Sequence, residues 1–459
     1  MKKDNDGPDS GYVGLLCLVA ALGGLLFGYD TAVISGAIGF IRQLFGLDAA
    51  QTGWAASSAL VGCVIGVAAA GAMSDFLGRK KGLVLAGVMF AVSAFGSALA
   101  RSLSELVIFR IVGGFGIGAA SMLSPLYIAE ISPAPTRGRL VSYNQLAIVS
   151  GMLIVYFVNY AIQRGGTTDW NVAVGWRWMF GSGALPALLF LVLLLRVPES
   201  PRWLVKQGRD GKALQVLTRI NGGTQAKREL AEIRKTVGRE SSSLGQLFQP
   251  GMRIVLAIGV MLAVLQQVTG INVFLYYGPE IFKKLGSGNS AAFLQTVIVG
   301  AVNMTFTFVA IRTVDRIGRK PLMLAGASGM GICLFVLGLS SYMQRTELWA
   351  LVFMLGYIAS FALSVGPVTW VILSEIFPTA IRGRAMALAT VCLWAANYIV
   401  SQTFPMMDEN PFLIRRFHHG FTFWIYALLC AVLILFVWRF VPETKGKSLE
   451  EIEGMWGKR

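Results

Sequence analysis

Long apolar runs, separated by short polar segments, follow one another along almost the whole sequence. Most of them hold about 20 residues, the length that an α-helix needs to cross a hydrocarbon core of ~30 Å. We expect twelve membrane-spanning helices, at 12–38, 53–74, 82–100, 105–128, 140–163, 176–196, 252–282, 290–312, 321–342, 348–376, 383–406 and 420–441. The pattern predicts an all-α polytopic membrane protein.

One long polar stretch divides these runs into two sets of six. Within it, "GRDGKALQVLTRI" and "KRELAEIRKTV" have helical periodicity but no membrane-length apolar run. We therefore expect short cytoplasmic helices between two bundles. The expected organisation is an N-terminal six-helix bundle (1–196), a linker (197–250), a C-terminal six-helix bundle (251–441) and a cytoplasmic tail (442–459).

Three motifs occur once in each set of runs, in the same order and at offsets of 240 to 245 residues. They are "DFLGRK" and "DRIGRK", "EISPAPTRGR" and "EIFPTAIRGR", and "VPESPR" and "VPETKG". Such a repeat indicates a parallel duplication of a six-helix unit. In transporters with this plan the substrate lies near the middle of the membrane, between the two halves.

Basic residues gather in every second loop, so the net charge of +16 carries information about topology. By the positive-inside rule, these loops and both termini lie in the cytoplasm. No small-residue cleavage site follows the first apolar run, which favours a true span over a removed signal peptide. We expect a multi-pass protein of the cytoplasmic (inner) membrane, in contact with the lipid bilayer and with no nucleic-acid partner.

The residues offer little material for catalysis or for binding a metal. All five cysteines lie inside apolar runs, and the two histidines, His418 and His419, are adjacent in a short polar loop. We find no nucleophile and base at catalytic spacing, and no ligand set for a metal. The expectation is a protein that is not an enzyme and has no cofactor and no metal.

The repeated motifs place acidic and basic residues together at the cytoplasmic ends of helices. Arginine suits paired hydrogen bonds to carboxylates at such ends. These charges can form a latch that breaks and re-forms as the cytoplasmic side opens; alternatively, they only set topology and cap helices. The candidates are Asp75, Arg79, Glu130, Arg137, Glu199, Arg202, Asp315, Arg319, Glu375, Arg382 and Glu443.

Two ionisable residues lie within apolar runs, Asp30 in the first and Arg110 in the fourth. Each is costly at membrane depth, so each is expected to face a partner or a water-filled cavity. A nearby arginine stabilises the aspartate anion, while burial favours the neutral acid. This opposition is typical of a proton carrier; a static structural ion pair is the alternative.

Amide and aromatic side chains gather in other spans, including four positions of "QQVTGINVFLYY". Positions 266, 269, 272 and 276 are spaced by three or four residues and are expected on one helix face. Amides donate and accept at once, and indole adds an apolar face, which together suit a sugar. Interhelical hydrogen bonds are the alternative. The candidates are Gln145, Gln266, Gln267, Asn272, Tyr276, Asn303, Trp370 and Trp394.

The motifs "GRK", "PESPRWL", "PETKG" and "QQVTGINVFLYY" together resemble the sugar porter family of the major facilitator superfamily, over essentially the entire chain. The resemblance implies twelve helices in two bundles that rock about a central sugar. It places sugar contacts at Gln145, Gln266, Gln267, Asn272, Trp370 and Trp394, with Tyr276 and Asn303 as additions. It also implies that Asp30 marks a proton-linked member, since facilitative carriers have a neutral residue there.

Within the family the chain resembles bacterial D-xylose:proton symporters most, but it has Met152 and Leu393 where those carry glutamine. The expected function is proton-coupled import of a monosaccharide, D-xylose being the lead candidate, by a chain that works as a monomer. A hexose symporter, a facilitative uniporter and a non-transporting sugar sensor are the alternatives.

Overall fold

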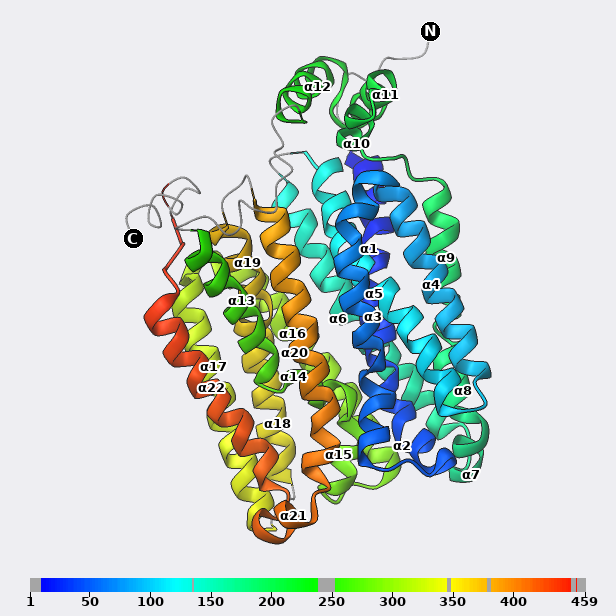
Figure 1. Ribbon diagram of the computed structural model, residues 1–459, viewed down its shortest axis with the longest axis vertical. Coiled ribbons are helices and arrows are strands. Elements are labelled where there is room, and N and C mark those ends of the chain that lie inside the picture. Colours follow the sequence, from blue (N-terminus) through cyan, green and yellow to red (C-terminus); the bar gives the residue numbers. More distant parts are fainter. Residues whose placement is uncertain are drawn as a thin grey trace.

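Two bundles of long helices stand side by side in the computed structural model, with three short helices at one end (Figure 1). The structure describes residues 10–133, 136–237, 252–344, 348–377, 381–446 and 451. Outside the described residues lie the first nine residues, 238–250 of the predicted linker, residue 251, and 447–450 and 452–459 of the predicted tail.

Six spans form the N-terminal half, drawn in blue to teal. They consist of α1 (Ser10–Ala32), α2 (Ile34–Phe45), α3 (Ala49–Phe76), α4 (Arg79–Leu99), α5 (Leu103–Ile131), α6 (Arg137–Arg164), α7 (Thr168–Trp170), the π-helix η1 (Asn171–Gly175), α8 (Trp176–Gly181) and α9 (Ala184–Leu195). Small residues let these helices approach closely. At Gly114, for example, a Cβ would lie 1.8 Å from the Ala59 carbonyl oxygen, so α3 and α5 pack backbone against backbone.

The C-terminal half, drawn in green to red, repeats the plan. It consists of α13 (Met252–Val268), α14 (Ile271–Tyr276), α15 (Gly278–Lys284), α16 (Asn289–Ile317), α17 (Arg319–Tyr342), α18 (Leu348–Ser360), the π-helix η3 (Phe361–Val365), α19 (Gly366–Ile376), α20 (Arg382–Asp408), α21 (Pro411–Phe417) and α22 (Gly420–Phe440). Across the junction, α3 packs against α20 and α6 against α16.

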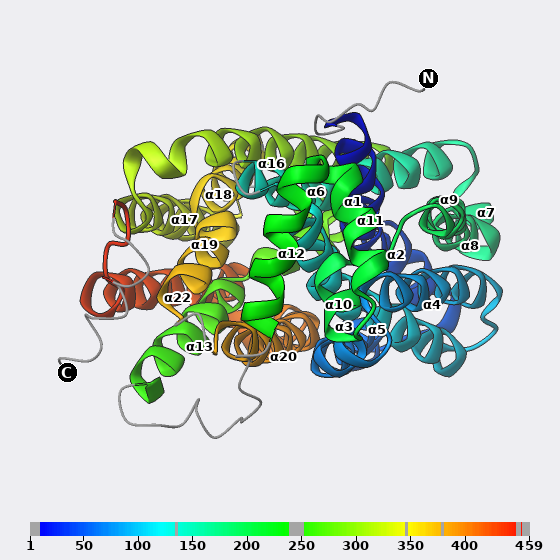
Figure 2. The ribbon, with the colours of Figure 1, turned by 90° about the horizontal axis from the view of Figure 1, so that it is seen from above.

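The segment between the halves is helical, as expected. It contains α10 (Pro201–Lys206), α11 (Asp210–Asn221) and α12 (Gly223–Val237), which lie in front of the junction of the two halves (Figure 2). We call this end of the molecule the linker face and the opposite end the distal face. α1 begins and α22 ends at the linker face (Figure 1).

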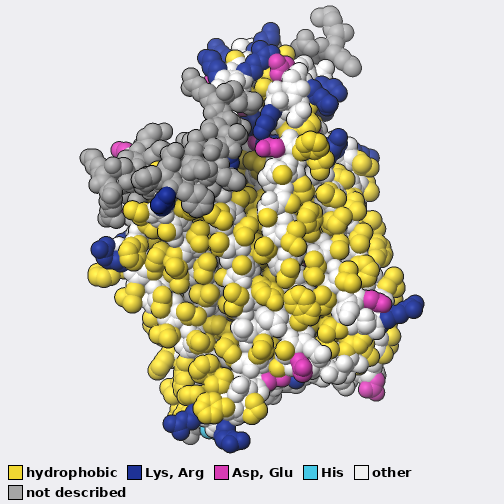
Figure 3. Space-filling view, viewed as in Figure 1, with side chains coloured by type: hydrophobic (Ala, Val, Ile, Leu, Met, Phe, Trp, Pro, Cys, Tyr) yellow, Lys and Arg dark blue, Asp and Glu magenta, His cyan; other side chains and the backbone are white. Residues whose placement is uncertain are grey.

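The surface agrees with a protein that crosses a membrane. On the face shown in Figure 3, a broad hydrophobic band covers the middle, and charged side chains gather towards the two ends. Within the described residues, eleven helical stretches are long and apolar enough to span, and α13 is a shorter apolar helix of 17 residues. The predicted all-α, two-bundle membrane fold is confirmed.

The seventh predicted span, 252–282, is not one helix. α13 ends at Val268, and Gly270 adopts φ +92°, a conformation that residues other than glycine rarely adopt. A Cβ at Gly270 would also lie 2.7 Å from the Tyr426 ring. The expectation that positions 266, 269, 272 and 276 share the face of a continuous helix is therefore wrong, because the helix breaks between them.

Candidate functional site

Asp30 and Arg110 meet inside the N-terminal half. The Arg110 Nη1 atom lies 3.1 Å from the Asp30 carboxylate and also donates a hydrogen bond of 3.1 Å to the Asp30 backbone carbonyl. Arg110 is 1% exposed, and its guanidinium lies 5.5 Å from the centre of the Phe180 ring. Such a buried pair is a poor source of net stability, but removing one partner leaves a costly unpaired charge.

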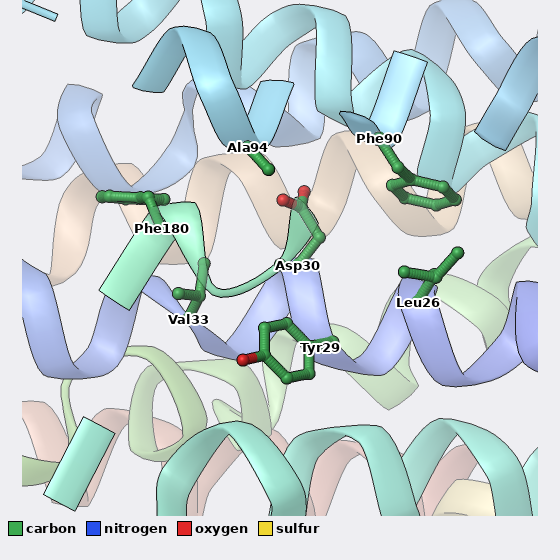
Figure 4. A pocket seen from close by; sticks show the side chains of 8 residues that line it. Leu26, Tyr29, Asp30, Val33, Phe90, Ala94 and Phe180 are labelled. Carbon is green, nitrogen blue, oxygen red and sulfur yellow. The ribbon is translucent and has the colours of Figure 1, made fainter. Parts of the chain in front are cut away.

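A small pocket borders the Asp30 carboxylate (Figure 4). Its lining comes entirely from the N-terminal half: Leu26, Tyr29, Asp30, Val33, Phe90, Ala94, Phe180 and Gly183. The carboxylate points towards α4, on the side of Phe90 and Ala94 (Figure 4). The acid is thus enclosed by its own half rather than by the junction between the halves.

The broken seventh span brings three of the predicted amide side chains together. Gln266 donates to the carbonyls of Val365 (3.2 Å) and Gly366 (2.9 Å), where η3 meets α19. The Gln267 side chain donates to the side-chain oxygen (Oε1) of Gln266 at 3.1 Å, and the Asn272 side chain donates to the side-chain oxygen of Gln267. The helix is interrupted at Gly270, and the three amides on either side of the break form one hydrogen-bonded row.

Tyr276 lies in the same region. Its hydroxyl accepts a hydrogen bond of 3.2 Å from the Asn397 side chain on α20. The preceding residue, Leu275, accepts one of 2.9 Å from the hydroxyl of Tyr156 on α6. The short helix α14 is therefore held by both halves, which places it at the junction between them.

Two further candidates touch the opposite half. Trp394 on α20 packs against Phe27 on α1, with ring centres 5.5 Å apart. Asn303 on α16 lies 4.0 Å from the Met152 sulfur on α6. The Trp394 indole nitrogen is buried and has no hydrogen-bond partner among the described residues, so it is a donor available to a ligand. The sequence indicated these residue types, but not which of them cross the junction.

Gln145 and Trp370 are half-buried, on α6 and α19. Neither takes part in the contacts described above. Leu393, which precedes Trp394, is 3% exposed and Met152 is 9% exposed, so both positions that the resemblance marks as departures are buried in the core.

The linker-face charges form two matching clusters, one in each half. Arg79 makes paired hydrogen bonds to Glu130, at 2.8 and 2.7 Å, and Arg319 lies 2.9 Å from Glu375. Glu199 accepts from the backbone N–H groups that begin α4, as Glu443 does from those that begin α17. These carboxylates thus stabilise the positive ends of two helix dipoles.

The other latch candidates lie around these two clusters. Asp75 pairs with Lys206 at 2.9 Å, and Asp315 with Arg319 at 2.9 Å. Arg137 donates to the Ser132 carbonyl at 3.5 Å, and Arg382 to that of Phe377 at 3.2 Å. Arg202 also has a partner in the structure. The pairs of Arg79 and Arg319 with Glu130 and Glu375 each join helices of one half.

The environment of Glu443 favours its charged form. Partial burial acts to raise the pKa of this carboxyl, but the backbone N–H groups of Lys445, Arg319 and Lys320 donate to it. These donors outweigh burial and hold the pKa of Glu443 below its usual value. The carboxylate therefore remains ionised, and remains a cap for α17, throughout the neutral range.

A charged cluster at the distal face was not predicted from the sequence. Arg42 of α2 makes two hydrogen bonds to Glu409, which directly follows α20, one of them at 2.8 Å. Lys284 of α15 bonds to Asp408 and lies 3.6 Å from Glu409. Two adjacent acids, Asp408 and Glu409, follow the eleventh predicted span, and this pattern in the sequence could have indicated the cluster.

His419 extends this cluster. Its Nδ1 atom lies 3.4 Å from Asp408. The hydrogen bond to Asp408 raises the pKa of the imidazole, against the effect of its partial burial. The pKa of His419 is thus higher in the folded state than in the unfolded state. The contact with Asp408 therefore stabilises the fold while the imidazole is protonated, and this stabilisation is lost as pH rises through the folded-state pKa.

Twelve spans in two duplicated halves, with α14 and the Trp394 indole at their junction and an amide row beside them, are typical of a transporter of small polar molecules. Residues 16–456 match the family model described as "Sugar (and other) transporter". The chain therefore belongs to the sugar transporter family, and the resemblance to sugar porters is confirmed.

Relatives agree over nearly the full length. The chain is 50% identical to the D-xylose-proton symporter of Escherichia coli (strain K12), over 98% of this chain and 96% of the relative. It is 48% identical to the arabinose-proton symporter of Bacillus subtilis (strain 168), with the same coverage. The solved structure of the proton:xylose symporter XylE bound to 6-bromo-6-deoxy-D-glucose matches with a TM-score of 0.83 and 50% identity, over 98% of this chain and all of that one.

Proposed function

We propose that this protein imports a monosaccharide together with a proton across the cytoplasmic membrane by alternating access. D-xylose is the lead candidate. The observation that carries the proposal is the buried Asp30–Arg110 pair. It lies about one turn of α1 from Phe27, which packs on Trp394 of the other half. Two relatives named as proton symporters of pentoses support it.

In this proposal the linker face is cytoplasmic, as are both termini, and the protein works as a monomer. The two bundles, 1–196 and 251–441, move as bodies joined by the linker. The sugar binds between Gln145 on one half and Gln266, Gln267, Asn272, Tyr276, Asn303, Trp370 and Trp394 on the other. No covalent step is involved.

Coupling of proton and sugar is proposed to run through α1. A proton from outside neutralises Asp30 and weakens its attraction to Arg110. Phe27, three residues earlier on the same helix, packs on Trp394 of the other half. A shift of α1 that follows neutralisation of Asp30 therefore changes the wall of the sugar site.

The test is transport by the purified protein in proteoliposomes. Sugar uptake that makes the outside medium more alkaline supports symport, and uptake without proton movement supports the facilitator. A sensor would give specific sugar binding without uptake. Competition by a panel of pentoses and hexoses against labelled xylose then identifies the preferred sugar.

The distal-face cluster is proposed to hold the extracellular side closed in this conformation. Glu409→Gln removes the charge that pairs with Arg42 across the halves. Because the pair is partly exposed, we expect a cost of about 1 kcal/mol, or a roughly fivefold shift towards conformations open to the outside. Distances between spin labels at Gln51 and Phe412, both exposed at the distal face, measure this shift.

Glu105→Gln is the matched control, because Glu105 accepts a hydrogen bond from the Arg101 backbone within one half. We expect it to leave the distance distribution unchanged. If Glu409→Gln and Glu105→Gln give the same distribution as the unmodified protein, the Arg42–Glu409 pair does not hold the extracellular side closed.

A further inference from the structure

Ser93 is a buried hydroxyl in the middle of α4 without a partner. It is 1% exposed, and its Oγ atom makes no hydrogen bond among the described residues. Several hydroxyls of the spans donate to the carbonyl four residues earlier, as Thr31, Ser150 and Thr390 do. Ser93 belongs to a smaller set of buried serines without a partner among the described residues: Ser35, Ser93, Ser97, Ser124 and Ser341. A buried polar group normally has a partner, and Ser93 is the member of this set that lies beside Asp30 at Gly113.

The hydroxyl borders the same small space as the Asp30 carboxylate. A Cβ placed on Gly113 would lie 2.3 Å from Ser93 Oγ and 3.0 Å from Asp30 Oδ2. The missing side chain at Gly113 therefore leaves a space that both oxygen atoms border. Figure 4 shows the carboxylate directed at α4, between Phe90 and Ala94, and Ser93 precedes Ala94 in the chain.

The Asp30 Oδ2 atom is itself short of hydrogen bonds. Arg110 Nη1 lies 3.1 Å away, but no group among the described residues has the geometry of a hydrogen bond to this oxygen. Two buried oxygens, one of a hydroxyl and one of a carboxylate, thus approach the same space without hydrogen bonds. The Ser93 hydroxyl has a proton of its own, but it makes no hydrogen bond to the carboxylate in the structure. A proton on the carboxyl would add a donor that the Ser93 oxygen can accept.

Few titratable groups surround Asp30. Arg110 faces it from α5, and the buried Cys63 thiol on α3 interacts electrostatically with both members of the pair. Tyr29, on the same helix as Asp30, directs its hydroxyl to Ser182 at 2.7 Å. From α4, Phe90 and Ala94 contribute only apolar side chains to the pocket. Ser93 does not line the pocket, but its Oγ atom borders the space beside Gly113 that Asp30 Oδ2 also borders.

We propose that Ser93 is a positioning residue of the proton site, which accepts a hydrogen bond from the neutral carboxyl of Asp30. This inference rests on the proposed symport. In the ion pair, the carboxylate is held by Arg110 and Ser93 stays unpaired. When a proton from the outer solution binds Oδ2, the new O–H donates to Ser93 Oγ. The proton leaves to the cytoplasm when Arg110 regains the carboxylate.

The test is the pH profile of proton-driven sugar uptake for Ser93→Ala. Loss of a partner for the neutral acid lowers the affinity of the site for the proton. We expect the midpoint of the profile to move to lower pH by about half a unit, a roughly threefold loss of proton affinity. Sugar exchange at equal concentrations on both sides, which needs no net proton movement, should keep its rate.

Ser97→Ala is the matched control. Ser97 lies one turn further along α4, is 0% exposed and also has an unpaired hydroxyl, but it is not among the atoms nearest to a Cβ at Gly113, where Ser93 and Asp30 are. We expect its midpoint to equal that of the unmodified protein. In the Asp30→Asn background, Ser93→Ala should have no effect on the pH dependence of exchange, because the acid that it serves is gone.

The outcomes separate this inference from the proposed function. If the unmodified protein moves no protons with sugar, the symport proposal fails and the inference with it. If symport holds but Ser93→Ala has the midpoint of Ser97→Ala, Ser93 has no part in the proton site. An equal fall in the amount of folded protein for both variants, with unchanged midpoints, shows a packing role only.

Discussion

Asp30→Asn is expected to abolish accumulation of sugar against a gradient while sugar exchange continues. Asparagine has nearly the same shape as aspartate and can still accept from Arg110, but it cannot bind and release a proton. One proton moved inward at 100 mV contributes ~2.3 kcal/mol. This supports about fortyfold accumulation, which the variant should lose completely. Uptake of labelled sugar into proteoliposomes with an imposed proton gradient measures it.

Asp30→Asn also leaves the buried charge of Arg110 without an acidic partner, so a loss of folded protein has to be separated from a loss of coupling. Arg110 is 1% exposed, and without an acid its charge is compensated only by dipoles such as the Asp30 carbonyl. Unpaired buried charges cost about 3–5 kcal/mol, so the amount of folded protein must be measured as well. Asp169→Asn, at an exposed acid of α7, is the matched control and should accumulate sugar normally. Accumulation that survives Asp30→Asn would show that Asp30 is not the coupling site.

Gln266→Ala is expected to weaken sugar binding at least tenfold, or about 1.4 kcal/mol. Gln266 is 2% exposed and anchors the amide row, because it bonds both to the backbone carbonyls where η3 meets α19 and to Gln267. Its loss leaves Gln267 without this partner and removes a donor and an acceptor from the amide row. Sugar binding to the purified protein, measured by calorimetry, gives the change in Kd.

Gln402→Ala distinguishes a sugar contact from a purely structural amide. Gln402 joins helices of the two halves, since it accepts from Ser57 at 2.8 Å and donates to the Ala50 carbonyl at 2.9 Å. It lies towards the distal end, away from the amide row. We expect it to lower stability without changing sugar affinity. If Gln266→Ala lowers affinity and folded protein to the same extent, its role is interhelical packing.

The fold class was predictable because membrane-spanning segments are specified locally. A run of about 20 apolar residues has no stable alternative to a helix in hydrocarbon, so the chain itself reveals its spans. The duplicated motifs were also recognisable, because a repeat is a property of the sequence alone. Asp30 and Arg110 were recognisable as a pair because an isolated charge at membrane depth is costly, and the structure places them 3.1 Å apart.

Side-chain partners within the junction were decided by tertiary structure. Periodicity assumes a regular helix, but Gly270 interrupts it, and the amide row arises from that break. The linker-face motifs predicted charges that pair, but not that Arg79 and Arg319 would meet Glu130 and Glu375 of their own halves.

What the sequence by itself determined is therefore the set of elements and the residues that cannot lie in lipid without a partner. Only the tertiary structure decided which partners they have. The distal pair of Arg42 and Glu409 joins residues 367 positions apart, and the space shared by Ser93 and Asp30 exists because Gly113 has no side chain. Contacts of this kind depend on how whole helices pack, and no local pattern in the chain records them.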